Sequence, residues 1–204
     1  MQKLTRVAVA AVLFFLGGCS DFSTPSNPND EQKVAETETS SNGVPSRRAP
    51  ITFIKLPASA VPRIEKYVSA RISPLLGGTI TVEYSYPKAN GGRCSISAKL
   101  VVPPLALLSD ETITVALDTV NAAVRFEPEG LTFLLPCLLD YSVTGLEAQP
   151  LGLAIGLYYV DNNGSPTKMP TGGISVNIST GSLALHLGVI PHFSRYIFGR
   201  LTDR

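Results

Sequence analysis

A two-residue alternation of apolar and polar side chains, recurring from about residue 51 onward, constrains the fold of this chain most strongly. In TITVEYSY (79–86) the two sets separate completely onto alternate positions. RCSISAKL (93–100), TITVALD (112–118), ISVNI (174–178) and LALHL (183–187) repeat the pattern. Successive side chains of a strand point to opposite faces, so the alternation predicts half-buried strands in antiparallel sheets. The side chains expected to point inward are Ile80, Val82, Tyr84, Tyr86, Cys94, Ile96, Ala98, Leu100, Ile113, Val115, Leu117, Ile174, Val176, Ile178, Leu183, Leu185 and Leu187.

Turn signals lie between these stretches. NGG (90–92), DNNGS (161–165), TGG (171–173) and TG (180–181) contain the Asn, Asp and Gly residues that tight turns favour. Short strands with frequent turns and no long helical pattern predict an all-β domain over residues 51–204, built as an antiparallel β-sandwich.

One segment is ambiguous. AVPRIEKYVSARI (60–72) places four apolar side chains at helical spacing, but a strand leading into Gly77 and Gly78 fits equally well. Both alternatives are open from the sequence.

The N-terminus carries the features of an export signal. Lys3 and Arg6 precede an apolar run of ten residues, VAVAAVLFFL (7–16). A bilayer span needs about 20 residues, so the run fits the apolar region of a signal peptide, residues 1–18, rather than a transmembrane helix.

The next residues, LGGC (16–19), resemble the lipobox of bacterial lipoproteins, in which a branched apolar residue and two small residues precede an obligatory cysteine. The resemblance implies that the Cys19 sulfur receives diacylglycerol, that the chain is cut before Cys19, and that the new amine is acylated, as with palmitate. Such lipids anchor a protein without spanning the membrane. Ser20 stands where an Asp would retain a lipoprotein at the inner membrane, which implies the outer membrane of the cell envelope. The alternative is an ordinary signal peptide with a chance cysteine.

Residues 19–50 differ in composition from the rest. The segment 21–50 is rich in Ser, Thr, Pro, Asn and Glu and poor in large apolar side chains. It cannot bury enough apolar surface to offset its chain entropy, so we expect a disordered tether. A flexible tether of this length reaches about 30 Å. The formal net charge of the chain is +1, so no nucleic-acid partner is expected.

Three stretches in the middle of the chain, LLGGTITV (75–82), SISAKLVVPPLALLSDETITVAL (95–117) and VRFEPEGLTFLLPCLLDYS (124–142), carry a family pattern. It consists of a Gly-Gly pair opening a strand, a strand ending in a proline turn, an aliphatic segment with an acidic or Ser/Thr cluster, and a later Pro-x-Gly turn. The corresponding residues are Gly77, Gly78, Pro103, Pro104, Ala106, Leu107, Ser109, Asp110, Glu111, Ile113, Thr114, Val115, Pro128, Gly130, Phe133 and Pro136. Roughly residues 75–143 thus resemble a ZU-five domain, a β-sandwich found in netrin receptors, zonula occludens proteins, ankyrins and many bacterial surface proteins. The chain departs from the pattern at Leu105, where the family often has Gly.

Members of this family bind proteins far more often than they catalyse reactions. The resemblance therefore implies a non-catalytic protein-interaction or structural module with a protein partner, and not an enzyme. Pairing through an exposed sheet edge is the physical mode that we expect.

The sequence PHFSRY (191–196) suggests an alternative function. Some relatives of ZU-five domains in death-domain and inflammasome proteins cleave themselves between Phe and Ser of a His-Phe-Ser sequence, which matches His192, Phe193 and Ser194. In this alternative the Ser194 hydroxyl attacks the Phe193 carbonyl, with His192 as base. A β-bulge between Phe193 and Tyr196 would strain the backbone there. In the simpler interpretation, Phe193 and Tyr196 anchor the last strand and Ser194 is an edge residue.

A carbohydrate-binding envelope module is a further alternative. It is disfavoured by the absence of Trp and the presence of only seven Tyr residues, because sugar platforms use large exposed aromatic rings.

The remaining reactive side chains are few. Cys94 and Cys137 both have inward parity, and they form either a disulfide, as an oxidising compartment permits, or two separate buried thiols. The two histidines, His186 and His192, have no thiol cluster beside them, so no metal site and no cofactor are expected. Glu127 and Glu129 flank a turn proline and are expected to be solvated.

Overall fold

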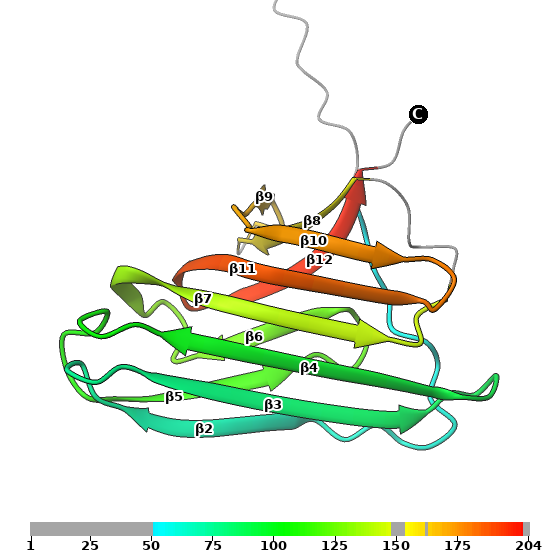
Figure 1. The fold of residues 1–204 in the computed structure, drawn as a ribbon, viewed down its shortest axis with the longest axis horizontal. Coiled ribbons are helices and arrows are strands. Elements are labelled where there is room, and N and C mark those ends of the chain that lie inside the picture. Colours follow the sequence, from blue (N-terminus) through cyan, green and yellow to red (C-terminus); the bar gives the residue numbers. More distant parts are fainter. Residues whose placement is uncertain (1–50, 148–153, 162, 202–204) are drawn as a thin grey trace, which may run out of the picture. The chain divides into compact units, whose positions relative to one another are not determined.

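The computed structural model describes residues 51–147, 154–161 and 163–201, which all belong to one compact unit. Their backbone forms two antiparallel sheets packed against each other, and the described residues contain no helix (Figure 1). The predicted all-β sandwich is therefore confirmed. The predicted signal peptide, Cys19 and tether lie outside the described residues. Within the described part of the chain, no helix is long and apolar enough to cross a membrane.

The first sheet holds seven strands. Its order is β2 (Lys66–Ile72), β5 (Glu111–Leu117), β6 (Ala123–Glu127), β12 (Arg195–Leu201), β8 (Ile155–Val160) and β9 (Pro166–Lys168), and β1 (Ile51–Phe53) also pairs with β12. The second sheet has the order β10 (Gly173–Asn177), β11 (Ser182–His192), β7 (Thr132–Thr144), β4 (Arg93–Val102) and β3 (Gly78–Pro87). The ambiguous segment 60–72 thus ends in strand β2 and contains no helix.

The core lies between the sheets and is formed largely by the positions that alternation predicts. On β4 the four expected side chains are all buried, and β5 buries its expected three. The expected residues that are buried are Ile80, Val82, Tyr86, Cys94, Ile96, Ala98, Leu100, Ile113, Val115, Leu117, Leu183 and Leu185. The polar alternates Thr79, Thr81 and Glu83 on β3 are exposed, because they face away from the first sheet and the core between the sheets.

The prediction that Leu187 points inward is wrong, because its side chain is 51% exposed. The register of β11 against β7 shifts between Leu185 and Gly188, and Leu187 has a φ of 51°. One irregular residue changes which face the following side chains occupy. Val176 and Ile178 are also exposed rather than inward, because β10 is the end strand of its sheet and Ile178 lies beyond its last residue.

Prolines and glycines end the strands where their chemistry requires it. Strand β4 ends at Val102, directly before Pro103 and Pro104, which cannot donate ladder hydrogen bonds. The residue after them, Leu105, has a φ of 64°, in the left-handed region that glycine adopts without strain. The departure from the family pattern thus falls at a position that favours glycine. In the β6–β7 turn, Gly130 has a φ of 81°.

The PHFSRY stretch is a corner between the sheets and not part of a single last strand. Strand β11 of the second sheet ends at His192, and β12 of the first sheet begins at Arg195. The chain therefore changes sheets at Phe193 and Ser194. The register irregularity in this region lies earlier, between Ile190 and His192. Phe193 and Tyr196 are both fully buried, as expected, because the corner turns both rings into the core.

Candidate functional site

The corner at Phe193 and Ser194 is fixed by three backbone hydrogen bonds. The Phe193 N–H donates to the carbonyl of Leu131 at 2.7 Å, and the Phe193 carbonyl accepts from the N–H of Gly130 at 3.0 Å. The Ser194 carbonyl accepts from the N–H of Phe126 at 3.0 Å. The β6–β7 turn and the end of β6 thus satisfy the polar groups of a buried crossing, as buried backbone requires.

Aromatic rings pack the inner side of the corner. Phe193 stacks on Phe126 with ring centroids 5.3 Å apart, and it meets Phe133 edge-on at 4.7 Å. The Tyr196 hydroxyl donates to the His192 carbonyl at 2.6 Å. Such aromatic pairs each add about 0.5–1.5 kcal/mol beyond the area that they bury. The corner is therefore a packed structural element.

The structure brings the three residues of the predicted cleavage motif, His192, Phe193 and Ser194, together only in part. Ser194 is 7% exposed and lies beside the Phe193 carbonyl. The His192 ring instead packs edge-on against Tyr159, with centroids 4.6 Å apart. Among the described residues, no hydrogen bond joins the His192 ring to the Ser194 hydroxyl. The Gly130 N–H thus donates a hydrogen bond to the Phe193 carbonyl, but the His192 ring, the predicted base, is not hydrogen-bonded to the Ser194 hydroxyl, the predicted nucleophile.

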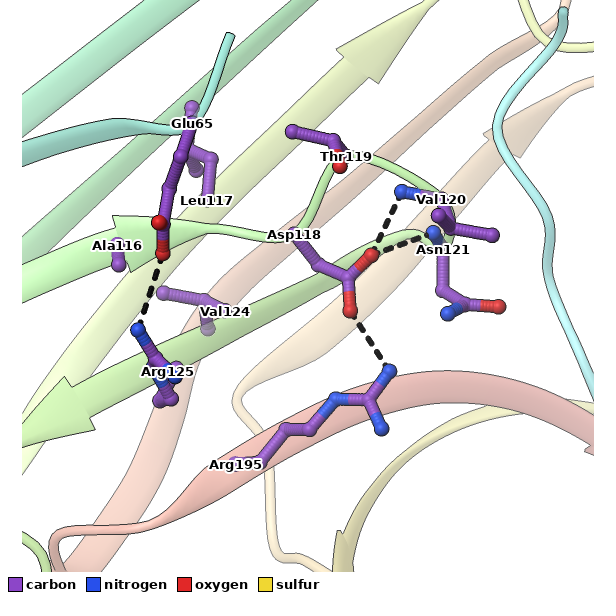
Figure 2. Close-up of a pocket in the computed structure, with 10 residues that line it drawn as sticks. All are labelled: Glu65, Ala116, Leu117, Asp118, Thr119, Val120, Asn121, Val124, Arg125 and Arg195. Atoms are coloured by element: carbon purple, nitrogen blue, oxygen red, sulfur yellow. Dashed lines mark hydrogen bonds and ion pairs between the residues drawn. The ribbon is translucent and has the colours of Figure 1, made fainter. Parts of the chain in front are cut away.

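A charged hollow of about 570 Å³ lies beside this corner, over the β5–β6 connection (Figure 2). Its charged side chains come from four separate parts of the chain and are Glu65, Asp118, Arg125 and Arg195. Sequence reasoning missed this hollow because no local pattern links them. Asp118 and Arg195, for example, are 77 positions apart.

Asp118 is the best-connected group in the hollow. One carboxylate oxygen accepts the N–H of Val120 at 2.7 Å and that of Asn121 at 2.8 Å. The other accepts from an Arg195 Nη atom at 2.7 Å. Burial acts to raise the pKa of Asp118, but the two N–H donors and the guanidinium outweigh it and hold the pKa below its usual value.

The two arginines of the hollow are each neutralised within it. Arg125 approaches the carboxylates of Glu65 at 3.0 Å and Glu127 at 3.3 Å, and Arg195 binds Asp118. Glu127 therefore pairs with an arginine at a half-exposed site rather than with Glu129. Among the described residues, each guanidinium of the hollow thus has an acidic partner.

The two cysteines are buried free thiols far from each other. Leu138, next to Cys137, pairs with Val101, whereas Cys94 lies seven residues from Val101 along β4. Seven residues of strand span about 23 Å, and a disulfide needs Cα atoms within about 7 Å. The disulfide alternative is therefore wrong, and the alternative of two separate buried thiols holds. Burial raises the pKa of Cys137 to about 12 and also raises that of Cys94.

The two histidines lie on the same strand, β11, but in different surroundings. His186 is exposed on β11, as its parity predicts, and His192 packs on Tyr159. Within the described ranges, no group of three or more His, Cys, Asp or Glu side chains has the geometry to hold a metal ion.

Comparison with known proteins adds no family. No protein-family model matches the chain, and no curated protein is significantly similar to it.

Proposed function

We propose that this chain is a lipid-anchored protein of the bacterial envelope. Its β-sandwich, of ZU-five type, is non-catalytic and either binds a protein partner or serves a structural role. The anchor is proposed from the charged, apolar and LGGC order at residues 3–19, and Ser20 favours the outer membrane. The module is proposed from the sandwich together with the pattern around residues 75–143.

The observation that supports protein binding most directly is the chemistry of the sheet edges. The end strands are β2 and β9 in the first sheet and β3 and β10 in the second. β2 carries Lys66 and Arg71, β3 carries Glu83, and β9 has only three residues, including Lys168. Charges and short length are the usual protection of an edge against other chains. By contrast, β10 (GISVN) has no charged residue.

The β10 edge also presents apolar side chains. Val176 is 36% exposed, and Ile178, just beyond the strand, is 55% exposed. An extended segment of a partner can pair with such an edge through backbone hydrogen bonds while the apolar side chains add contact area. We therefore place the partner strand on β10.

Site-specific photo-crosslinking in intact cells tests this proposal. A photoreactive residue replaces Ser175 on β10 or, as the matched control, Thr81 on the charged β3 edge; both positions are exposed. We expect a discrete protein adduct from position 175 and none from 81. Val176→Lys, which adds the missing edge charge, should abolish the adduct. Equal adducts from both edges, or an adduct that survives Val176→Lys, would contradict pairing at β10.

Self-cleavage is a second candidate, favoured by the Gly130 N–H that lies 3.0 Å from the Phe193 carbonyl oxygen. In this reaction the Ser194 Oγ bonds to the Phe193 carbonyl carbon as a base takes its proton, and the C–N bond breaks as that proton passes to the Ser194 nitrogen, which gives an ester and a free Ser194 amine. Water then hydrolyses the ester to leave a Phe193 carboxylate. The Gly130 N–H would stabilise the negative charge on the carbonyl oxygen.

Intact mass spectrometry under denaturing conditions tests cleavage. A cut chain releases residues 194–204, and Ser194→Ala, which lacks the nucleophile, stays whole. A wild-type chain that remains uncut after prolonged incubation would contradict self-cleavage and leave Ser194 with a structural role in the packed corner.

We do not propose carbohydrate binding. Stacking on a sugar needs exposed rings, and in the described part of the chain Tyr67 is the one large aromatic side chain among the exposed hydrophobic residues.

A further inference from the structure

Six leucines gather, solvent-exposed, at one end of the sandwich. They lie in the β2–β3 turn, in the β4–β5 loop and near the start of β7, all on the left in Figure 1. Together they are called the leucine tip: Leu75, Leu76, Leu105, Leu108, Leu134 and Leu135. Their exposure runs from 46% at Leu135 to 87% at Leu108.

Backbone hydrogen bonds hold the three segments of the leucine tip together. The Leu105 N–H donates to the Pro74 carbonyl at 2.7 Å, and the Leu134 N–H donates to the Ala106 carbonyl at 2.9 Å. The tip is therefore a single built surface and not three unrelated loops. Contiguous exposed apolar surface of this kind marks an interaction site in a folded protein.

The leucine tip contains no charge. The stretches 73–82, 100–109 and 131–139, which supply all six leucines, contain no Asp, Glu, Lys, Arg or His. The nearest charges in sequence, such as Lys99 and Asp110, fall just outside these stretches. In the structure the exposed Arg71–Asp110 ion pair borders the tip, at the end of β2 and in the β4–β5 loop, while the leucines themselves form a surface without charge. Such a surface enters hydrocarbon without the large cost of desolvating an ion.

Leu105 shows that an apolar side chain is kept in this tip at a cost to the backbone. Its φ of 64° favours glycine, yet it carries a large side chain that is 60% exposed. An exposed side chain gains little from the core, so folding alone does not account for a leucine there. Backbone strain of this type clusters at functional sites, and the chain has it also at Leu187, which lies outside the tip.

We propose that the leucine tip inserts into the lipid surface to which Cys19 anchors the chain. The inference rests on the proposed function for the presence of that membrane. Protein-binding hot spots favour Trp, Tyr and Arg and under-use Leu, whereas lipid chains match an all-leucine surface. An anchor on Cys19, joined by the predicted tether of about 30 Å reach, keeps the sandwich at high local concentration beside the bilayer.

Spin labelling of the full, lipidated chain in vesicles of phosphatidylethanolamine and phosphatidylglycerol tests the inference. The label replaces Leu108 through Leu108→Cys or, as control, Asn90 through Asn90→Cys in the exposed β3–β4 turn at the other end of those strands. Cys94 and Cys137 are buried and stay unlabelled in the folded chain. We expect position 108 to collide more with oxygen than with a water-soluble nickel chelate, and position 90 to show the reverse.

Each other outcome overturns a defined part of the proposal. A chain that floats with vesicles while position 108 stays as accessible to nickel as position 90 contradicts insertion and leaves the anchor intact. Shielding of position 108 from nickel in the absence of vesicles assigns the tip to a second copy of the chain instead of lipid. A wild-type chain that does not float at all contradicts the anchor, and with it insertion.

Discussion

Arg125 on β6 and Arg195 on β12 lie directly opposite each other in the first sheet. Like charges facing each other across paired strands destabilise a sheet. Here each arginine has its own acidic partner, since Asp118 binds Arg195 at 2.7 Å and Glu65 binds Arg125 at 3.0 Å. The pairing of these two strands next to the corner therefore depends on charge compensation from neighbouring segments.

The first prediction concerns acid stability. Because the pKa of Asp118 is lowered in the folded state, its carboxylate stabilises the fold at pH values above about 4, the unfolded pKa. This contribution is lost as the pH falls through the lowered folded value. Asp118→Asn should lower stability at pH 7 by about 1 kcal/mol, the scale of a partly screened charged hydrogen bond. Urea unfolding of both chains between pH 3 and 7 should show the difference shrinking toward acid; a constant difference would contradict the assignment.

The second prediction separates two buried tyrosines. The Tyr141 hydroxyl has no hydrogen-bond partner among the described residues, whereas that of Tyr196 donates to the His192 carbonyl. An unpaired buried hydroxyl costs free energy, so Tyr141→Phe should leave stability unchanged or raise it. Tyr196→Phe should lower the free energy of unfolding by about 1 kcal/mol. Chemical denaturation of the two variants in parallel measures this; equal losses would contradict the contrast.

The strands were predictable because burial in a sandwich imposes a period of two. Ile80, Leu100 and Ile113 follow it, and the packed core confirms them. The prediction failed at Leu187 because its N–H donates to the carboxylate of Asp140, 47 positions away, within an irregular stretch of β11. No window of sequence around Leu187 contains that partner.

Of the candidate site, only the part that lies within one short stretch of sequence, residues 191–196, was predictable. Phe193 was expected in the core and is there, but the change of sheet at Ser194 could not be read from alternation, which assumes a continuing strand. The Asp118–Arg195 pair depends on the order of strands in the first sheet. Strand order follows from tertiary packing, so local patterns carry no signal for it.

The third prediction concerns the thiols. Cys94 and Cys137 are buried at distant points of the β4–β7 pair, and burial raises the pKa of both. At pH 8 the folded chain should therefore react very slowly with iodoacetamide, which requires the thiolate. After unfolding without reductant, both cysteines should be alkylated. Peptide mass spectrometry measures this, and a linked Cys94–Cys137 peptide would contradict the register.

The fourth prediction tests the anchor. Cys19→Ala removes the sulfur that the lipobox resemblance assigns to diacylglycerol. The variant should carry no radiolabelled fatty acid and should leave the membrane fraction for the soluble fraction. Ser20→Ala, which keeps the cysteine, serves as the matched control and should remain labelled. Persistent labelling of the Cys19→Ala chain would show that the lipid is attached elsewhere.

The last prediction compares two leucines of the leucine tip, Leu105 and Leu108, in their effects on folding stability and on membrane contact. Leu105→Gly places glycine at a φ of 64°, where it is unstrained, and should raise the free energy of unfolding by about 1 kcal/mol. Leu108→Gly removes an equally apolar, 87% exposed side chain from the same loop at a residue without positive φ, and should not stabilise the fold. If lipid insertion is the reason for the tip, both variants should show weaker nickel protection at a label on position 135 in vesicles. The two measurements then diverge, with one variant gaining stability and both losing membrane contact. A stabilised Leu105→Gly chain with unchanged protection would mean that Leu105 has no part in membrane contact.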